Sequence, residues 1–261
     1  MLLAACGSAG LLELCLSSAQ LCARDTSALK HVLSVALDAA SGTLLLALLA
    51  NTAAASGERA ADVDVVWLMS LQCVADEWRE VQRVQTKCTY FFGWVGLSFA
   101  GHSRVLCGHR NAYMLYAFDV IAESRLRPVG AVELAARLER FASTRLGGDS
   151  LVAIADAGHT CVSVQRLVGA GDELRLEPLA RTALAGAWNV LFRGDQLLVA
   201  TYYNSVVSFG VSGGGLRGPR ELLGAGADVR VDCWCLAGDR LVVASRWPSW
   251  DFVLYEWAAP E

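Results

Sequence analysis

Three stretches of this chain decide its fold: Gly148–Ala153 has the sequence GDSLVA, Gly194–Val199 has GDQLLV, and Gly238–Val243 has GDRLVV. Their first glycines lie 46 and then 44 residues apart. In each stretch a glycine with a polar neighbour supplies a tight turn, and the continuous apolar run that follows is typical of a strand buried on both faces. A period of this length indicates a repeat architecture.

Two weaker copies lie upstream of these stretches. Gly101–Leu106 begins 47 residues before the first of them, and the glycine of Ser41–Leu46 lies a further 59 residues upstream. The 13 extra residues in that interval match a polar, alanine-rich stretch, Ala53–Ala61. The sequence therefore predicts five copies of one supersecondary unit.

Each copy predicts four strands. A run of β-formers precedes the glycine and would form the innermost strand, and a third and a more polar fourth strand follow the buried second one. This gradient of burial is typical of a propeller blade, whose outer strands meet water. The expected first strands are Val32–Leu37, Phe91–Leu97, Phe141–Leu146, Trp188–Phe192 and Val231–Leu236, and the expected fourth strands are Arg79–Val84, Leu126–Val132, Leu174–Leu179 and Arg220–Leu223. Residues 131–141 are expected to be a loop with at most a short helical turn.

The last copy lacks a fourth strand, because only four residues follow Trp257. Residues 11–16 precede the first copy and belong to no copy of their own. We expect this N-terminal strand to complete the last sheet and close the ring, which would remove an exposed edge. The chain is then one domain, residues 1–261, with blades at roughly 31–84, 90–132, 139–179, 187–223, and 229–257 plus 11–16.

In this order of strand, Gly-Asp turn, strand, loop and strand, the chain resembles the β-propeller superfamily over about residues 11–257, with a WD-repeat-like period. The strict WD signatures are absent, since Trp67 is followed by Leu68 and Trp257 by Ala258. The resemblance implies an all-β propeller of about five four-stranded antiparallel blades, as in small propellers among invertebrate lectins and some glycosidases. Part of a larger ring is the alternative.

Composition narrows the classes of partner. With 54% hydrophobic and 18% charged residues and a net charge of −4, the chain can bury a large core and lacks the basic footprint of a nucleic-acid-binding protein. Glu13 interrupts the apolar N-terminus, so no membrane insertion is expected. Cys107, Cys161, Cys233 and Cys235 lie in apolar runs, which favours buried reduced thiols and a cytoplasmic location. Neither a cofactor nor a metal is expected.

The loops that join second to third strands differ between copies while the strands repeat, which is the pattern of a binding face. Trp, Tyr and Arg are over-represented at binding hot spots. We expect this face to bind a protein or peptide partner as a non-catalytic scaffold; lectin-like carbohydrate binding is the alternative, since aromatic rings also stack on sugars. The candidate residues are His109, Arg110, Asn111, His159, Tyr202, Tyr203, Asn204, Arg246, Trp247 and Trp250.

Enzymatic activity is not expected from the sequence. A propeller glycosidase needs two carboxylates near the axis, and only Asp25, Glu139, Asp228 and Asp232 lie near the starts of innermost strands. There is no nucleophile elbow, and the four His residues show no metal-ligand spacing with Cys or acid. A glycosidase is therefore the least favoured alternative.

Overall fold

The structure is a computed structural model. It describes residues 2–5, 11–15, 20–23, 32–38, 43–50, 64–74, 77–90, 95–101, 103–110, 112–158, 160–203, 205–213, 215–223, 233–237, 240–245 and 251–256. The elements of this part are strands, apart from two three-residue 3-10 turns, η2 (Ala122–Ser124) and η3 (Gly171–Glu173). No helix in these ranges is long and apolar enough to cross a membrane.

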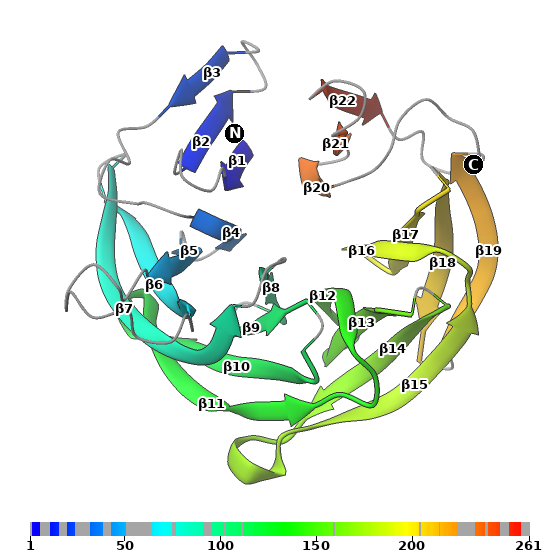
Figure 1. The fold of residues 1–261 in the computed structure, drawn as a ribbon, viewed down its shortest axis with the longest axis horizontal. Helices are drawn as coiled ribbons and strands as arrows, with labels where there is room; N and C mark the ends of the chain where they lie inside the picture. Colours follow the sequence, from blue (N-terminus) through cyan, green and yellow to red (C-terminus); the bar gives the residue numbers. More distant parts are fainter. Residues whose placement is uncertain are drawn as a thin grey trace. The chain divides into compact units, whose positions relative to one another are not determined.

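The chain divides into two compact units, residues 1–135 with 169–175, and residues 136–168 with 176–261. The first unit contains three antiparallel sheets, in which each strand pairs with the next along the chain (Figure 1). They are β1 (Leu2–Ala5), β2 (Leu11–Cys15) and β3 (Gln20–Ala23); β4 (Val32–Asp38), β5 (Thr43–Ala50), β6 (Asp64–Val74) and β7 (Glu77–Tyr90); and β8 (Val95–Phe99), β9 (Arg104–His109), β10 (Met114–Ile121) and β11 (Arg125–Glu133).

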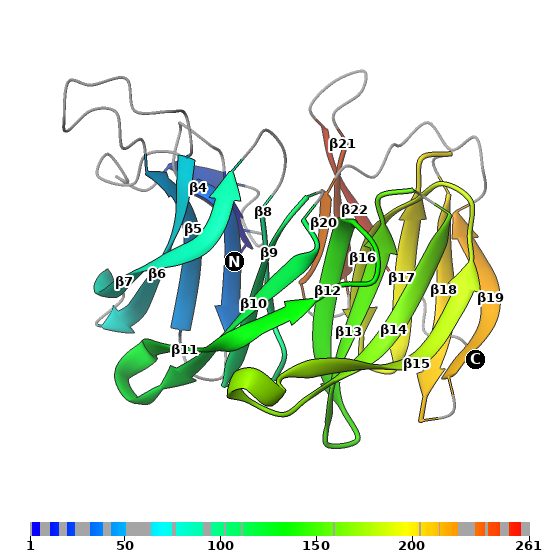
Figure 2. The same ribbon diagram turned by 60° about the horizontal axis from the view of Figure 1, so that its bottom comes forward.

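The second unit repeats this plan. Its sheets are β12 (Leu138–Leu146), β13 (Asp149–Asp156), β14 (Cys161–Val168) and β15 (Arg175–Ala183); β16 (Ala187–Arg193), β17 (Gln196–Thr201), β18 (Val206–Ser212) and β19 (Gly215–Leu223); and β20 (Cys233–Ala237), β21 (Arg240–Ser245) and β22 (Asp251–Glu256). Within this unit β12 packs against β16, and β16 against β20, so first strand meets first strand (Figure 2). Four-stranded antiparallel sheets packed in this way are propeller blades, which confirms the predicted fold class.

Each predicted first and fourth strand is present, and five of the nine lie within three residues of their predicted bounds. β8 begins four residues later than predicted, β7 ends six residues later, β15 ends four residues later, and β19 begins five residues earlier. Two further regions differ in kind. β12 begins at Leu138, so the loop expected over residues 131–141 is reduced to residues 134–137. Residues 11–15 are not a fourth strand of the last sheet: Leu12 of β2 is opposite Ala4 of β1 on one side and Ala23 of β3 on the other. Both backbone edges of β2 are therefore hydrogen-bonded, which leaves none for β22. Closure of a ring and a single domain over residues 1–261 stay predictions.

The fourth strands carry residues that discourage pairing with another chain. Pro128 lies in β11, Pro178 in β15 and Pro219 in β19, which together hold three of the five prolines in the sequence. Proline has no N–H to offer and is tolerated in sheets mainly at edges. The same three strands have mostly exposed or half-buried residues. The polar fourth strand seen in the sequence is thus an outer edge.

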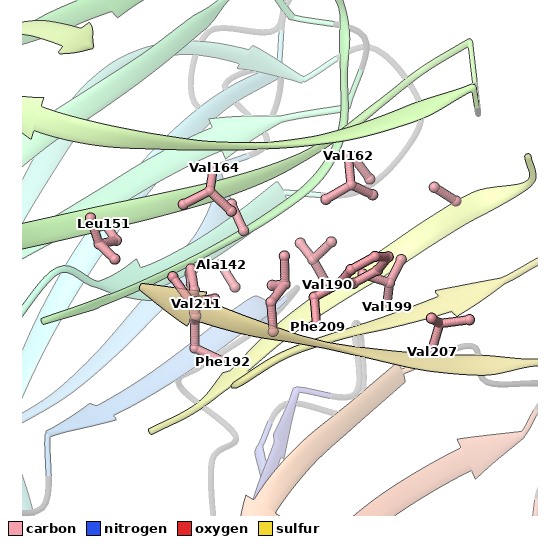
Figure 3. Packing of buried hydrophobic residues seen from close by; sticks show 14 residues of the cluster. Ala142, Leu151, Val162, Val164, Val190, Phe192, Val199, Val207, Phe209 and Val211 are labelled. Atoms are coloured by element: carbon pink, nitrogen blue, oxygen red, sulfur yellow. The ribbon is translucent and has the colours of Figure 1, made fainter. Parts of the chain in front are cut away.

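The core of the second unit lies between the β12–β15 and β16–β19 sheets (Figure 3). Leu151 and Val164 come from one sheet, and Val199 and Phe209 from the other; all four side chains are buried. β17 is buried from Leu197 to Thr201, as its unbroken apolar run predicts. Each fully buried aliphatic side chain contributes about 1.5–3 kcal/mol, so these second strands account for much of the stability of the blades.

Candidate functional site

Three first strands share a β-bulge at their second residue. The register shifts fall between Val32 and Ser34, between Leu138 and Arg140, and between Ala187 and Asn189. The bulged residues are Leu33, Glu139 and Trp188. Bulges turn a strand locally and re-aim a side chain, and they are frequent beside active sites. At the starts of β12 and β16 the bulged residues are therefore chemically different, an acid in one strand and a tryptophan in the other.

Arg140, Trp188 and Tyr202 form a cluster at these starts, called the Arg140 cluster below. The guanidinium carbon of Arg140 lies 5.4 Å from the centre of the Trp188 ring. The Trp188 and Tyr202 ring centres are 4.4 Å apart, with their planes tilted by 49°. All three side chains are half-buried. A cation over an indole face is stabilised by the ring quadrupole, and the paired rings present an aromatic surface beside a fixed positive charge.

Backbone hydrogen bonds hold the connections around this cluster. The Leu184 N–H donates to the Thr160 carbonyl at 3.0 Å, and the Tyr202 N–H donates to the Gly186 carbonyl at 2.8 Å. The loops that follow β13 and β17 are therefore both tied to the β15–β16 connection. Fixed backbone is what a binding site needs to keep its side chains in one geometry.

Asp156, the last residue of β13, closes the loop that follows it. Its carboxylate accepts from the Thr160 N–H at 2.9 Å, the Thr160 hydroxyl at 3.0 Å and the Cys161 N–H at 3.3 Å. Burial acts to raise the pKa of Asp156, but these hydrogen bonds outweigh it and hold that pKa below its ordinary value. Because both oxygens are occupied, the role of Asp156 is to shape the loop.

Cys161 lies between opposite charges. Its thiol donates to Asp156 Oδ2 at 3.4 Å, and its sulfur accepts from Arg181 Nε at 3.1 Å. Burial raises the pKa of the Cys161 thiol, even though the hydrogen bond from Arg181 acts to lower it. The Cys161 side chain therefore links Asp156, at the end of β13, to Arg181 of β15. As predicted, Cys107 and Cys161 are buried.

Thr201 has the corresponding position in β17. Its hydroxyl lies 2.7 Å from the Ser205 hydroxyl and accepts from the Tyr203 N–H at 3.2 Å. Both Thr201 and Ser205 are buried. A polar residue at the end of the second strand thus closes the next loop in both blades.

The structure describes four of the ten residues predicted to bind a partner. His109 ends β9 and is buried, and burial lowers its pKa below the ordinary value; Arg110 follows it and is half-buried. Tyr202 belongs to the Arg140 cluster, and Tyr203 is exposed beside it in the chain. The predicted residues outside the described ranges are Asn111, His159, Asn204, Arg246, Trp247 and Trp250.

Sequence reasoning missed Arg140 and Trp188. Trp188 was expected only as the start of a strand, and Arg140 lay in an expected loop. Neither bulge has a residue signature, so the meeting of these two side chains was not visible. Glu139 was noted as an axial acid; it is fully buried, with no exposed surface. Asp25, Asp228 and Asp232 lie outside the described residues.

Comparison with known proteins supports the fold. No protein-family model matches the chain, and no curated protein matches its sequence. Among solved structures, it is similar to a protein from Bacteroides uniformis named provisionally as a 6-phosphogluconolactonase, with a TM-score of 0.63 and 12% identity, covering 95% of this chain and 74% of that one.

Two further structures are similar to the same extent. A protein of unknown function from Desulfotomaculum acetoxidans has a TM-score of 0.65 at 11% identity, over 97% of this chain and 78% of that one. A protein from Lactobacillus plantarum has a TM-score of 0.55 at 12% identity, over 94% and 76%. The class of protein is therefore a β-propeller. None of the three is named as a WD-repeat protein, so the comparison supports the propeller-like fold and not the WD-repeat resemblance.

The comparison corrects two predictions. The chain was expected to be a non-catalytic module for a protein or peptide partner, and no enzyme; instead, the Bacteroides structure that shares its fold is named after a hydrolase. The physical reason for the error is that a propeller site is assembled from side chains of several blades. No contiguous motif then marks it, and the absence of one argues little against catalysis.

Proposed function

We propose that the chain is a hydrolase of sugar-derived lactones, acting at the Arg140 cluster. The observation that carries this proposal is the guanidinium of Arg140 held over Trp188, whose ring is paired in turn with Tyr202. Aromatic rings stack on the apolar faces of sugar rings. A fixed cation stabilises the negative charge that develops when an ester carbonyl is attacked. The cluster offers both in one place.

Lactone hydrolysis needs one water and no other reactant. Water attacks the carbonyl carbon and gives a proton to a base; the ring C–O bond then breaks, and the ring oxygen takes up a proton to leave a hydroxy acid. We assign the carbonyl oxyanion to Arg140 and the base to a second water molecule. Glu139, the bulged residue just before Arg140, is fully buried and has no surface that a water could touch, so it is given no part in the reaction.

The comparison adds the substrate class to this proposal. The name of the Bacteroides protein denotes hydrolysis of a phosphorylated sugar lactone. Because the two chains are only 12% identical, we take from that name the class of reaction and not the particular substrate. We keep a cytoplasmic location within the proposal as well, because Cys161 is a buried thiol, which suits a reducing compartment.

The test is hydrolysis of glucono-δ-lactone and 6-phosphogluconolactone by the purified chain, with the spontaneous rate subtracted. We expect Arg140→Ala to lower kcat/KM by about 100-fold, as loss of an oxyanion partner does. Arg145→Ala is the matched control, because Arg145 is an exposed arginine on the same strand. No rate above background for either lactone would overturn the proposal, as would full activity in Arg140→Ala.

A further inference from the structure

Tyr203 is the most exposed large aromatic or aliphatic side chain in the described ranges, at 63%. It is also the residue that follows Tyr202 of the Arg140 cluster. A ring this exposed gains little from burial, so its contribution to folding is small. The stability of the blade therefore does not explain why an aromatic residue stands at position 203.

The Tyr203 ring packs against the backbone of Gly186, where any larger residue would clash with it. A Cβ atom on Gly186 would lie 2.7 Å from Tyr203 Cε2 and 2.9 Å from its Cδ2, closer than side-chain carbons approach. Gly186 also has φ +74°, which disfavours other residues there. The Cδ2–Cε2 edge of the ring therefore rests against the β15–β16 connection while most of the ring faces solvent.

The backbone of Tyr203 is held as well. Its N–H donates to the Thr201 hydroxyl, which is buried and lies 2.7 Å from the Ser205 hydroxyl. The preceding Tyr202 N–H donates to Gly186. Tyr202 and Tyr203 are thus both held at the β15–β16 connection, where the Trp188 and Tyr202 side chains are half-buried and the Tyr203 side chain is exposed.

A surface of this kind suits a second sugar ring. The rings provide stacking faces, the tyrosine hydroxyls can bond sugar hydroxyls, and no ordering of a loose loop is needed on binding. Resting on the proposed lactone hydrolysis, we propose that Tyr203 forms a second sugar subsite, so that the preferred substrate is an aldonolactone of disaccharide size.

The test compares maltobionolactone with glucono-δ-lactone in the full chain. We expect the disaccharide lactone to have the lower KM, and Tyr203→Ala to raise that KM about tenfold, as loss of one stacking contact would. KM for the single-ring lactone and kcat for both are expected to stay unchanged. Tyr113→Ala is the matched control, since Tyr113 is another exposed tyrosine, at 48%. Equal KM changes for the two lactones would overturn the subsite.

Binding without turnover separates this inference from the activity it rests on. Maltobionic acid, the hydrolysis product, is titrated calorimetrically into the chain and into Tyr203→Ala. Tyr203-dependent binding without hydrolysis of any lactone would support the subsite and overturn the proposed activity. Hydrolysis with Tyr203-independent binding would do the reverse. Tyr203→Leu keeps an apolar side chain against the Gly186 backbone but removes the stacking ring, and it is expected to weaken binding to the same extent. If Tyr203→Ala lowers the melting temperature, Tyr203→Leu decides the outcome.

Discussion

The guanidinium of Arg140 and the indole of Trp188 meet at 5.4 Å across two neighbouring blades, each at or beside a bulged position of its own first strand. We expect Trp188→Leu to release this contact and the contact with Tyr202. Because a partly desolvated cation–π pair is worth about 0.5–2 kcal/mol, the free energy of unfolding should fall by about that amount or somewhat more. Urea unfolding measures it, and no change would show that the contact is incidental.

The lowered pKa of Asp156 predicts how the stability of the chain changes in acid. Since its pKa in the folded chain lies below the ordinary value of 3.8, the carboxylate stabilises the fold above that value, and this contribution is lost as the pH falls through the folded-state pKa. Asp156→Asn should therefore lose less stability than the parent between pH 5 and about pH 3. The exposed Asp172 of η3 provides the control, Asp172→Asn. An unaltered acid response in Asp156→Asn would contradict the prediction.

Asp119 forms ion pairs with two arginines that differ in burial, Arg104 and Arg127. Arg104 Nε lies 2.9 Å from Asp119 Oδ1, and Arg104 Nη1 donates to the Gly169 carbonyl at 3.2 Å; the Arg104 side chain is 23% exposed. Arg127 contacts the other carboxylate oxygen but is 65% exposed. Arg104→Ala should cost about 1–3 kcal/mol of stability, whereas Arg127→Ala should cost much less. Thermal unfolding compares the two, and equal melting temperatures would show that burial makes no difference here.

Leu198 tests the importance of the second strands. It is fully buried in β17 and packs with Val206 and Leu241. Leu198→Ala should cost about 2–5 kcal/mol, because a cavity is added to the lost transfer free energy. Leu37→Ala, at a site that is 41% exposed, should stay within about 0.5 kcal/mol of the parent. A small effect at Leu198 would mean that the core collapses to fill the cavity.

The fold was largely predictable because it depends on local properties. The Gly-Asp turns, the apolar second strands and the polar fourth strands each act within a few residues, and the repeat multiplies the signal. The N-terminal sheet was the exception: Leu2–Ala5 and Gln20–Ala23 are four-residue strands that lie outside the repeat. Pairing β2 with these strands instead of β22 depends on which backbone edges come together, and short apolar segments do not specify that.

The sequence by itself determined the all-β repeat, the burial of its second strands and the aromatic loop at Tyr202 and Tyr203. Only the tertiary structure decided that the Arg140 guanidinium lies over the Trp188 ring, and that the Tyr203 ring packs against Gly186. The physical reason is that a strand pattern records which face of a sheet a residue occupies. A bulge changes that face without changing composition, and contacts between blades join residues that no spacing in the sequence relates.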